Sequence, residues 1–169
     1  MTLWYATRAF GIASLLLLST VMVLGLLTAG RRTGFVAAGL HRTLSMLSVV
    51  FIALHVVSAV TDGYVPLKWL DIVIPFGSAY QPLWTGLGAV AVDLLIALVV
   101  TSLVRVHLGL RAWRAVHWLA YLCWPIALAH GLGQGTDRIS PLLLLPVALS
   151  VLVVGGAALL RTTKLGALR

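Results

Sequence analysis

The sequence predicts an all-α integral membrane protein, a bundle of about five transmembrane helices. Of its 169 residues, 61% are apolar and only 9% are charged, whereas about a quarter of the residues of a soluble domain are charged. The apolar residues form long runs, and most charged residues lie between the runs. The formal net charge of +8 comes from basic residues at the ends of these runs, a distribution that sets membrane topology rather than binding nucleic acid.

Five apolar runs are long enough to cross about 30 Å of hydrocarbon at about 1.5 Å per residue. They comprise residues 4–28, 41–60, 84–104, 117–132 and 140–160. The first run is too long for the apolar core of a signal peptide and has no basic region before it beyond Arg8, so we interpret it as a retained helix. The fourth run is the shortest, and it contains Pro125, which we expect to distort the helix.

The basic residues predict the orientation of the helices. Lysines and arginines are concentrated in the loops after the first and third runs and in the tail, whereas the other two loops have no net positive charge. Short loops rich in lysine and arginine remain in the cytoplasm. We therefore expect a multi-pass protein of a cell membrane, of the bacterial inner or plasma membrane type, with its N-terminus outside and its C-terminus in the cytoplasm.

Four of the five histidines lie within the predicted spans, His41 and His55 on the second and His117 and His130 on the fourth. A spacing of 14 residues gives a rise of about 21 Å and returns the second ring to within about 40° of the first. A spacing of 13 gives about 19.5 Å but separates the two rings by about 140° in an ideal helix, so the two pairs match in depth and not in phase. In the predicted topology His41 and His117 lie at the cytoplasmic end, and His55 and His130 lie toward the outer end.

Two pairs of imidazoles at matched depths are typical of two b haems. Iron held by two neutral imidazoles transfers one electron with little structural change, and an apolar porphyrin fits between helices. Ionisable groups inside a membrane are costly and mark function, although such histidines could also form hydrogen bonds between helices or line a water-filled cavity. Cys123 is the only cysteine, which disfavours a thiolate zinc or copper site.

The haem propionates require cationic partners near the membrane surface. The candidate side chains are Arg32, Arg42, Arg105 and Arg114 on the cytoplasmic side and Lys68 and Arg138 on the outer side.

Several other residues have two interpretations each. Asp93 lies near the middle of the third span, where an ionised carboxylate costs about 3 kcal/mol. It is either a proton relay or quinone contact, or a helix-tying group bonded, for example, to Tyr121. Cys123 and Trp124 lie either on an electron path or in ordinary core packing. His107 falls in a predicted cytoplasmic loop, where it is either solvated or in contact with an electron donor.

The sequence resembles a known family in three places. These are the opening segment Trp4-Tyr5-Ala6-Thr7-Arg8, His41-Arg42 with His55, and His117-Trp118 with His130. All three are similar to the ferric reductase-like transmembrane domain, the haem module of NADPH oxidases, ferric-chelate reductases and the haem-bearing membrane subunit of bacterial methionine sulfoxide reductase systems. The resemblance implies one domain over residues 1–169. It also implies that His41 pairs with His117 on the inner haem and His55 with His130 on the outer haem.

The resemblance also implies partners. NADPH oxidases continue into a flavin and NADPH domain, whereas here a basic tail of nine residues follows the last span, and the sequence has no G-x-G-x-x-G or P-loop pattern. We therefore expect no flavin or nicotinamide domain in this chain. The electron donor is expected to be a separate flavin-containing protein or a quinone.

The expected function is transmembrane electron transfer by the haem subunit of an oxidoreductase. Ferric chelates, oxygen, a quinone or an extracytoplasmic redox protein are the possible acceptors, and the sequence determines neither the acceptor nor the direction. Two alternatives remain open. In one, a single haem binds at the inner pair. In the other, the chain is a haem-free transport or assembly subunit whose histidines move protons or metal, which predicts a colourless purified protein.

Overall fold

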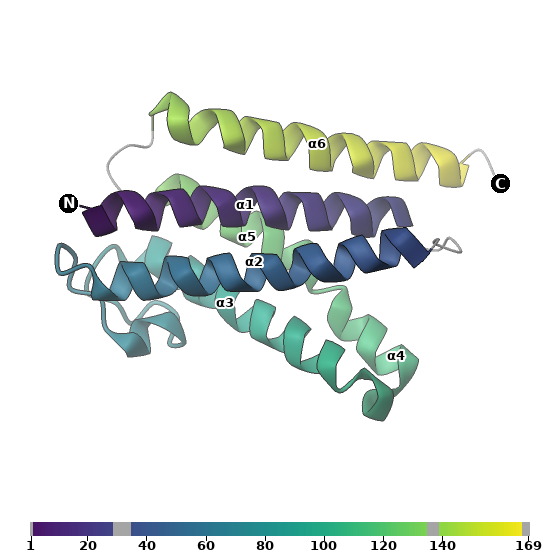
Figure 1. Cartoon of the computed structure of the whole chain (residues 1–169), viewed down its shortest axis with the longest axis horizontal. Helices are drawn as coiled ribbons and strands as arrows, with labels where there is room; N and C mark the ends of the chain where they lie inside the picture. The colour runs from purple at the N-terminus through teal and green to yellow at the C-terminus, as the bar shows by residue number, and fades with distance from the viewer. Residues whose placement is uncertain (1, 29–34, 135–138, 167–169) are drawn as a thin grey trace. The chain divides into compact units, whose positions relative to one another are not determined.

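The computed structural model describes residues 2–28, 35–134 and 139–166, and within them all regular structure is helical (Figure 1). The elements are α1 (Thr2–Thr28), α2 (Phe35–Thr61), the short 3-10 helix η1 (Trp69–Ile72), α3 (Pro82–Leu103), α4 (Arg105–His117), α5 (Ala120–Gly133) and α6 (Pro141–Gly166). Helices α1, α2, α3 and α6 are each long and apolar enough to cross a membrane, and α4 with α5 forms a bent fifth candidate. The prediction of an all-helical, multi-pass membrane protein is confirmed.

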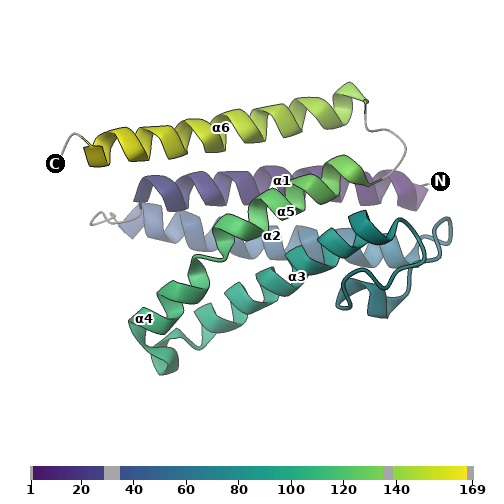
Figure 2. The same cartoon turned by 180° about the vertical axis from the view of Figure 1, so that it is seen from behind.

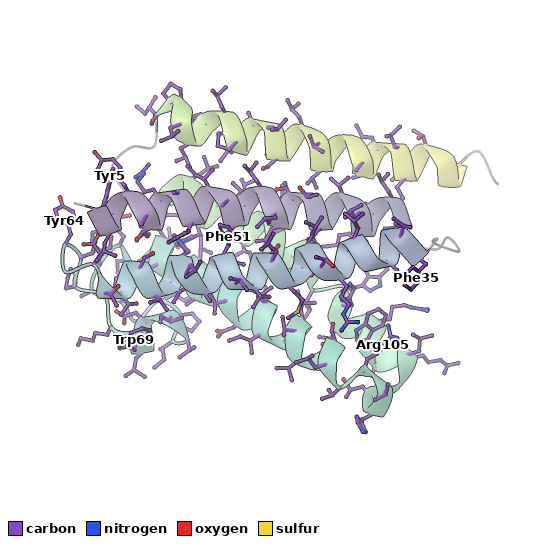
Figure 3. All side chains as sticks on the ribbon, viewed as in Figure 1. Tyr5, Phe35, Phe51, Tyr64, Trp69 and Arg105 are labelled. Atoms are coloured by element: carbon purple, nitrogen blue, oxygen red, sulfur yellow. The ribbon has the colours of Figure 1, made fainter. Side chains whose placement is uncertain are left out.

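The helices form two compact units, and each is described by itself. The first comprises Met1–Ser58 with Ile139–Arg169. In this unit α1 packs against α6, and the α6 residues that α1 covers recur at helical spacing as Leu143, Val147 and Val154. On its other side α1 meets α2, where the rings of Phe10 and Phe51 make an edge-to-face contact with centroids 6.1 Å apart (Figure 3).

The second unit comprises Ala59–Arg138. Helix α3 packs along α5 and also contacts α4 and η1 (Figure 2). Close packing depends on small residues at the contacts, as expected for helices in a membrane. A Cβ at Gly133 of α5 would collide with the indole of Trp84, and a Cβ at Gly86 of α3 would collide with the ring of Phe76.

The segment before the fourth predicted span differs from the prediction. It was interpreted as a cytoplasmic loop, whereas Arg105–His117 is the helix α4, interrupted only at Gly109, whose φ is 75° and ψ 158°. The loop interpretation was therefore wrong. The chain bends by 44° between α4 and α5, at Trp118 and Leu119, and Pro125 lies inside α5 after the bend.

Two other helices are longer than their predicted spans. Helix α2 begins at Phe35, so His41 lies inside the helix rather than at its first residue. Helix α6 continues to Gly166. Both extensions are polar or weakly apolar turns that a search for long apolar runs does not include.

Candidate functional site

The imidazole of His55, on α2, is held by the backbone of α1. Its Nδ1–H donates to the carbonyl oxygen of Thr7 at 2.8 Å. Because a carbonyl can only accept, the proton lies on Nδ1 and the ring lone pair on Nε2. The imidazole also lies against Gly11, where a Cβ would come within 3.0 Å of the ring carbon Cε1. A glycine is therefore required one turn after the residue whose carbonyl accepts the proton.

His41 has a similar environment, 14 residues earlier on α2. The backbone of Val21 interacts with its imidazole, and the Cε1 atom lies 3.6 Å from where a Cβ of Gly25 would be. Val21 and Gly25 each lie 14 residues after the corresponding residue beside His55. Because the two helices run antiparallel, one step of 14 residues along α1 matches the step between the two histidines.

His130, on α5 in the second unit, repeats this arrangement on a different pair of helices. Its Nδ1–H donates to the carbonyl oxygen of Trp84 on α3 at 2.7 Å. The ring lies against Gly88, where a Cβ would come within 2.7 Å of both Cε1 and Nδ1. We use the term carbonyl–glycine cradle for a backbone carbonyl that meets an imidazole, followed four residues later by a glycine against the same ring. His41, His55 and His130 each lie in such a cradle.

His117 is oriented by an aromatic stack. It is the last residue of α4, and its ring lies 4.8 Å from the ring centroid of Trp113, at an interplanar angle of 25°. The indole Nε1–H of Trp113 donates to Ser102 Oγ at 3.3 Å. The guanidinium carbon of Arg105 lies 5.2 Å from the indole centroid, a cation–π contact (Figure 3). The indole is thus held from two sides and fixes one face of the His117 ring.

The predicted propionate partners are placed only in part. Arg42 on α2 and Arg114 on α4 are exposed, so both guanidinium groups are available to an anion. Arg32 and Arg138 lie outside the described residues. His107 is exposed on α4 rather than in the predicted loop.

The two other predicted positions have different surroundings. Cys123 is only 4% exposed, and its Sγ–H donates to the carbonyl of Ala91 on α3 at 3.5 Å, which favours the packing interpretation. Asp93 is half-buried. Within the described part of the chain it forms no hydrogen bond or ion pair, so the suggested bond to Tyr121 is not formed there.

The residues of the cradles were missed from the sequence. A signal was available, because Gly11 and Gly25 have the same 14-residue spacing as His41 and His55. A glycine in a membrane helix indicates close approach of some neighbour, but it does not identify that neighbour as an imidazole.

A histidine whose second nitrogen donates to a backbone acceptor is the usual arrangement of a metal-ligating histidine. The residues present therefore fit a haem iron bound through Nε2. Across residues 2–28, 35–134 and 139–166, no group of three or more histidine, cysteine or acidic side chains converges as a metal site. These features define a multi-pass helical membrane protein with oriented imidazoles inside its spans.

Comparison with known proteins agrees with this class. Residues 10–128 match the family described as ferric reductase like transmembrane component. The match covers more than half of the chain, and the chain therefore belongs to this family. At this coarse level its role is transmembrane electron transfer. No curated protein and no solved structure matches the chain.

Proposed function

We propose that this chain carries electrons across the membrane through two b haems, each held by two histidines. The observation that carries the proposal is the pair of Nδ1–H bonds from His55 and His130 to backbone carbonyls, at 2.8 and 2.7 Å. These bonds fix the neutral tautomer with its lone pair on Nε2, the form that binds iron, and raise its strength as a ligand. A bound haem supplies reversible one-electron chemistry.

The proposed pairs are His41 with His117 for the inner haem and His55 with His130 for the outer haem. Two features support this pairing. The spacings of 14 and 13 residues span similar depths, about 21 and 19.5 Å, and the family assignment favours such a ligand set. The unequal spacing also has a local explanation in the second unit. On an unbroken helix, the position two heptads before His130 would be Val116, and the 44° bend separates His117 from that ideal register.

Exposed arginines are the proposed partners of the haem propionates. Arg42 and Arg114 would neutralise the inner propionates, together with Arg32, and Arg138 would serve the outer haem. A guanidinium pairs with a carboxylate through two parallel hydrogen bonds, which makes arginine well suited to this role. The basic loops support an orientation in which the N-terminus is outside and the C-terminus in the cytoplasm.

The proposed physiological role is the membrane haem subunit of an oxidoreductase in a cell membrane. The donor would be a separate flavin-containing protein or a quinone. The acceptor would be a ferric chelate, oxygen, a quinone or an extracytoplasmic redox protein. The family assignment supports a redox-partner role at the coarse level.

The decisive experiment is a dithionite-reduced minus oxidised spectrum of the detergent-purified chain, with pyridine haemochrome quantitation. We expect a b-type α-band and two haems per chain. His55→Ala and His130→Ala should each remove the same haem, and His41→Ala and His117→Ala the other. His107→Ala is the matched control, because this exposed histidine of α4 is outside the proposed ligand set.

Three results would change the proposal. One haem per chain in the unmodified protein would support a single site. Loss of different haems from His55→Ala and His130→Ala would overturn the pairing. A colourless protein after haem-supplemented expression would overturn the haem function and favour the transport alternative.

A further inference from the structure

A side-chain hydrogen bond lies next to the His55 cradle. Thr7 Oγ1–H donates to Ser58 Oγ at 2.9 Å, and Ser58 Oγ–H donates to the carbonyl of His55 at 3.0 Å. Thr7 is the same residue whose carbonyl accepts the Nδ1–H of His55. Its backbone and its side chain therefore both bind the turn of α2 that begins at the histidine, and Ser58 is only 6% exposed.

A second pair lies next to the His130 cradle, in the other unit. Gln134 Nε2–H donates to Thr85 Oγ1 at 3.4 Å, and Thr85 Oγ1–H donates to the carbonyl of Tyr80 at 2.8 Å. Thr85 directly follows Trp84, whose carbonyl accepts the Nδ1–H of His130. Gln134 lies four residues after the histidine, as Ser58 lies three residues after His55. The same relation thus occurs on two separate helix pairs.

These bonds are not what hydroxyl groups of these helices generally do. Thr20 on α1 and Thr101 on α3 donate to carbonyls of their own helices, those of Leu16 and Ala97. The His41 cradle also differs, because the residue that corresponds to Thr7 is Val21, whose side chain cannot form a hydrogen bond. A hydroxyl bond between helices therefore distinguishes the His55 cradle from the His41 cradle on the same two helices.

We propose that Thr7 with Ser58, and Thr85 with Gln134, are positioning pairs for the two outer ligands. Each pair joins the ligand helix to the helix that supplies the carbonyl, one turn from the histidine. This bond keeps the carbonyl within reach of Nδ1–H. The proposal rests on the proposed haem function and extends it, because it assigns a specific control of the outer site to residues that do not bind the haem.

The expected consequence follows from ligand strength. An Nδ1–H bond to a carbonyl makes Nε2 a better donor to iron, and a better donor stabilises the oxidised form. Loss of a positioning pair should therefore raise the midpoint potential of the outer haem and change the orientation of its imidazoles. The inner haem should not change.

The test uses the full-length, haem-loaded chain, with Thr7→Val and Thr85→Val as isosteric variants that remove only the hydroxyl. Ser58→Ala is a second variant of the first pair. Thr20→Val and Thr101→Val are the matched controls on the same helices. The measurements are the low-spin haem g-values by electron paramagnetic resonance and a redox titration of each haem, with the outer signal identified by its loss in His55→Ala.

We expect Thr7→Val, Ser58→Ala and Thr85→Val to retain two haems but to shift the outer g-values and raise the outer potential. Thr7→Ser, which keeps the hydroxyl, should behave as the unmodified chain does. Unshifted signals in both threonine variants, or equal shifts in the two controls, would overturn this proposal alone. An unmodified chain without haem would overturn it together with the proposed function.

Discussion

Replacement of Gly88 by alanine tests the cradle most directly. The new Cβ would lie 2.7 Å from two atoms of the His130 ring, whereas ordinary van der Waals contact begins at 3.4 Å. The ring must therefore recede by about 0.7 Å, which lengthens the 2.7 Å bond to the Trp84 carbonyl to about 3.4 Å, beyond the usual limit of about 3.2 Å.

The magnitude follows from two costs. Overpacking typically costs about 1–3 kcal/mol, and a lost hydrogen bond adds about 1 kcal/mol. A total of about 2–4 kcal/mol weakens haem binding at the outer site by about 30- to 700-fold, at about 1.4 kcal/mol per factor of ten. The same calculation gives a graded series, because a Cβ at Gly11 would lie 3.0 Å from the His55 ring and one at Gly25 would lie 3.6 Å from the His41 ring.

The assay is haem content per chain with the reduced-minus-oxidised spectrum. Gly88→Ala should lose most of the outer haem, Gly11→Ala should lose less, and Gly25→Ala should retain the inner haem. Gly155→Ala on α6 is the control, because nothing lies within 4 Å of its added Cβ. The reasoning is refuted if Gly88→Ala binds both haems with unchanged spectra, or if Gly25→Ala loses as much haem as Gly88→Ala.

Three further predictions concern the rest of the chain. Trp113→Leu should shift the g-values of the inner haem because His117 loses its aromatic contact, whereas Trp113→Phe should shift them less; equal spectra for both variants would contradict the stacking role. Cys123, at 4% exposure, should react with maleimide at least tenfold more slowly in the folded chain than in SDS, and fast labelling without SDS would contradict its packing against α3. Asp93→Asn should retain both haems and raise the melting temperature in detergent, because it removes the insertion cost of about 3 kcal/mol for an ionised carboxylate; a lower melting temperature would reveal a partner for the charge.

The spans could be predicted because length and hydropathy alone define them. Helix α4 could not be found in this way, because Arg105, Arg111 and Arg114 interrupt any long apolar run. The bend between α4 and α5 has no sequence marker either. Trp118 and Leu119 keep φ angles of −64° and −62°, with ψ angles of −21° and −17°, values typical of a 3-10 turn that most residues can adopt.

The histidines of the candidate site could be predicted, because an ionisable side chain in a membrane span is costly and requires a reason. Their orientation could not. Which nitrogen of His55 carries the proton depends on a carbonyl 48 residues away in the sequence. Backbone carbonyls are present at every residue, so only the helix register identifies the one at Thr7. The paired 14-residue spacings of glycine on α1 and histidine on α2 are the sequence record of that register.

The separation of four residues within each cradle has a physical origin. In an α-helix the carbonyl of one residue points toward the amide of the residue four positions later. The side chain at that later position is therefore the one closest to the carbonyl oxygen, and it hinders a lateral approach by any other donor. Glycine removes this obstacle at Gly11 and Gly88, so an imidazole can reach the carbonyls of Thr7 and Trp84 at 2.8 and 2.7 Å. The carbonyl and the glycine thus act as one unit, and a glycine four residues after a carbonyl is useful only where a neighbouring helix brings a donor to that turn.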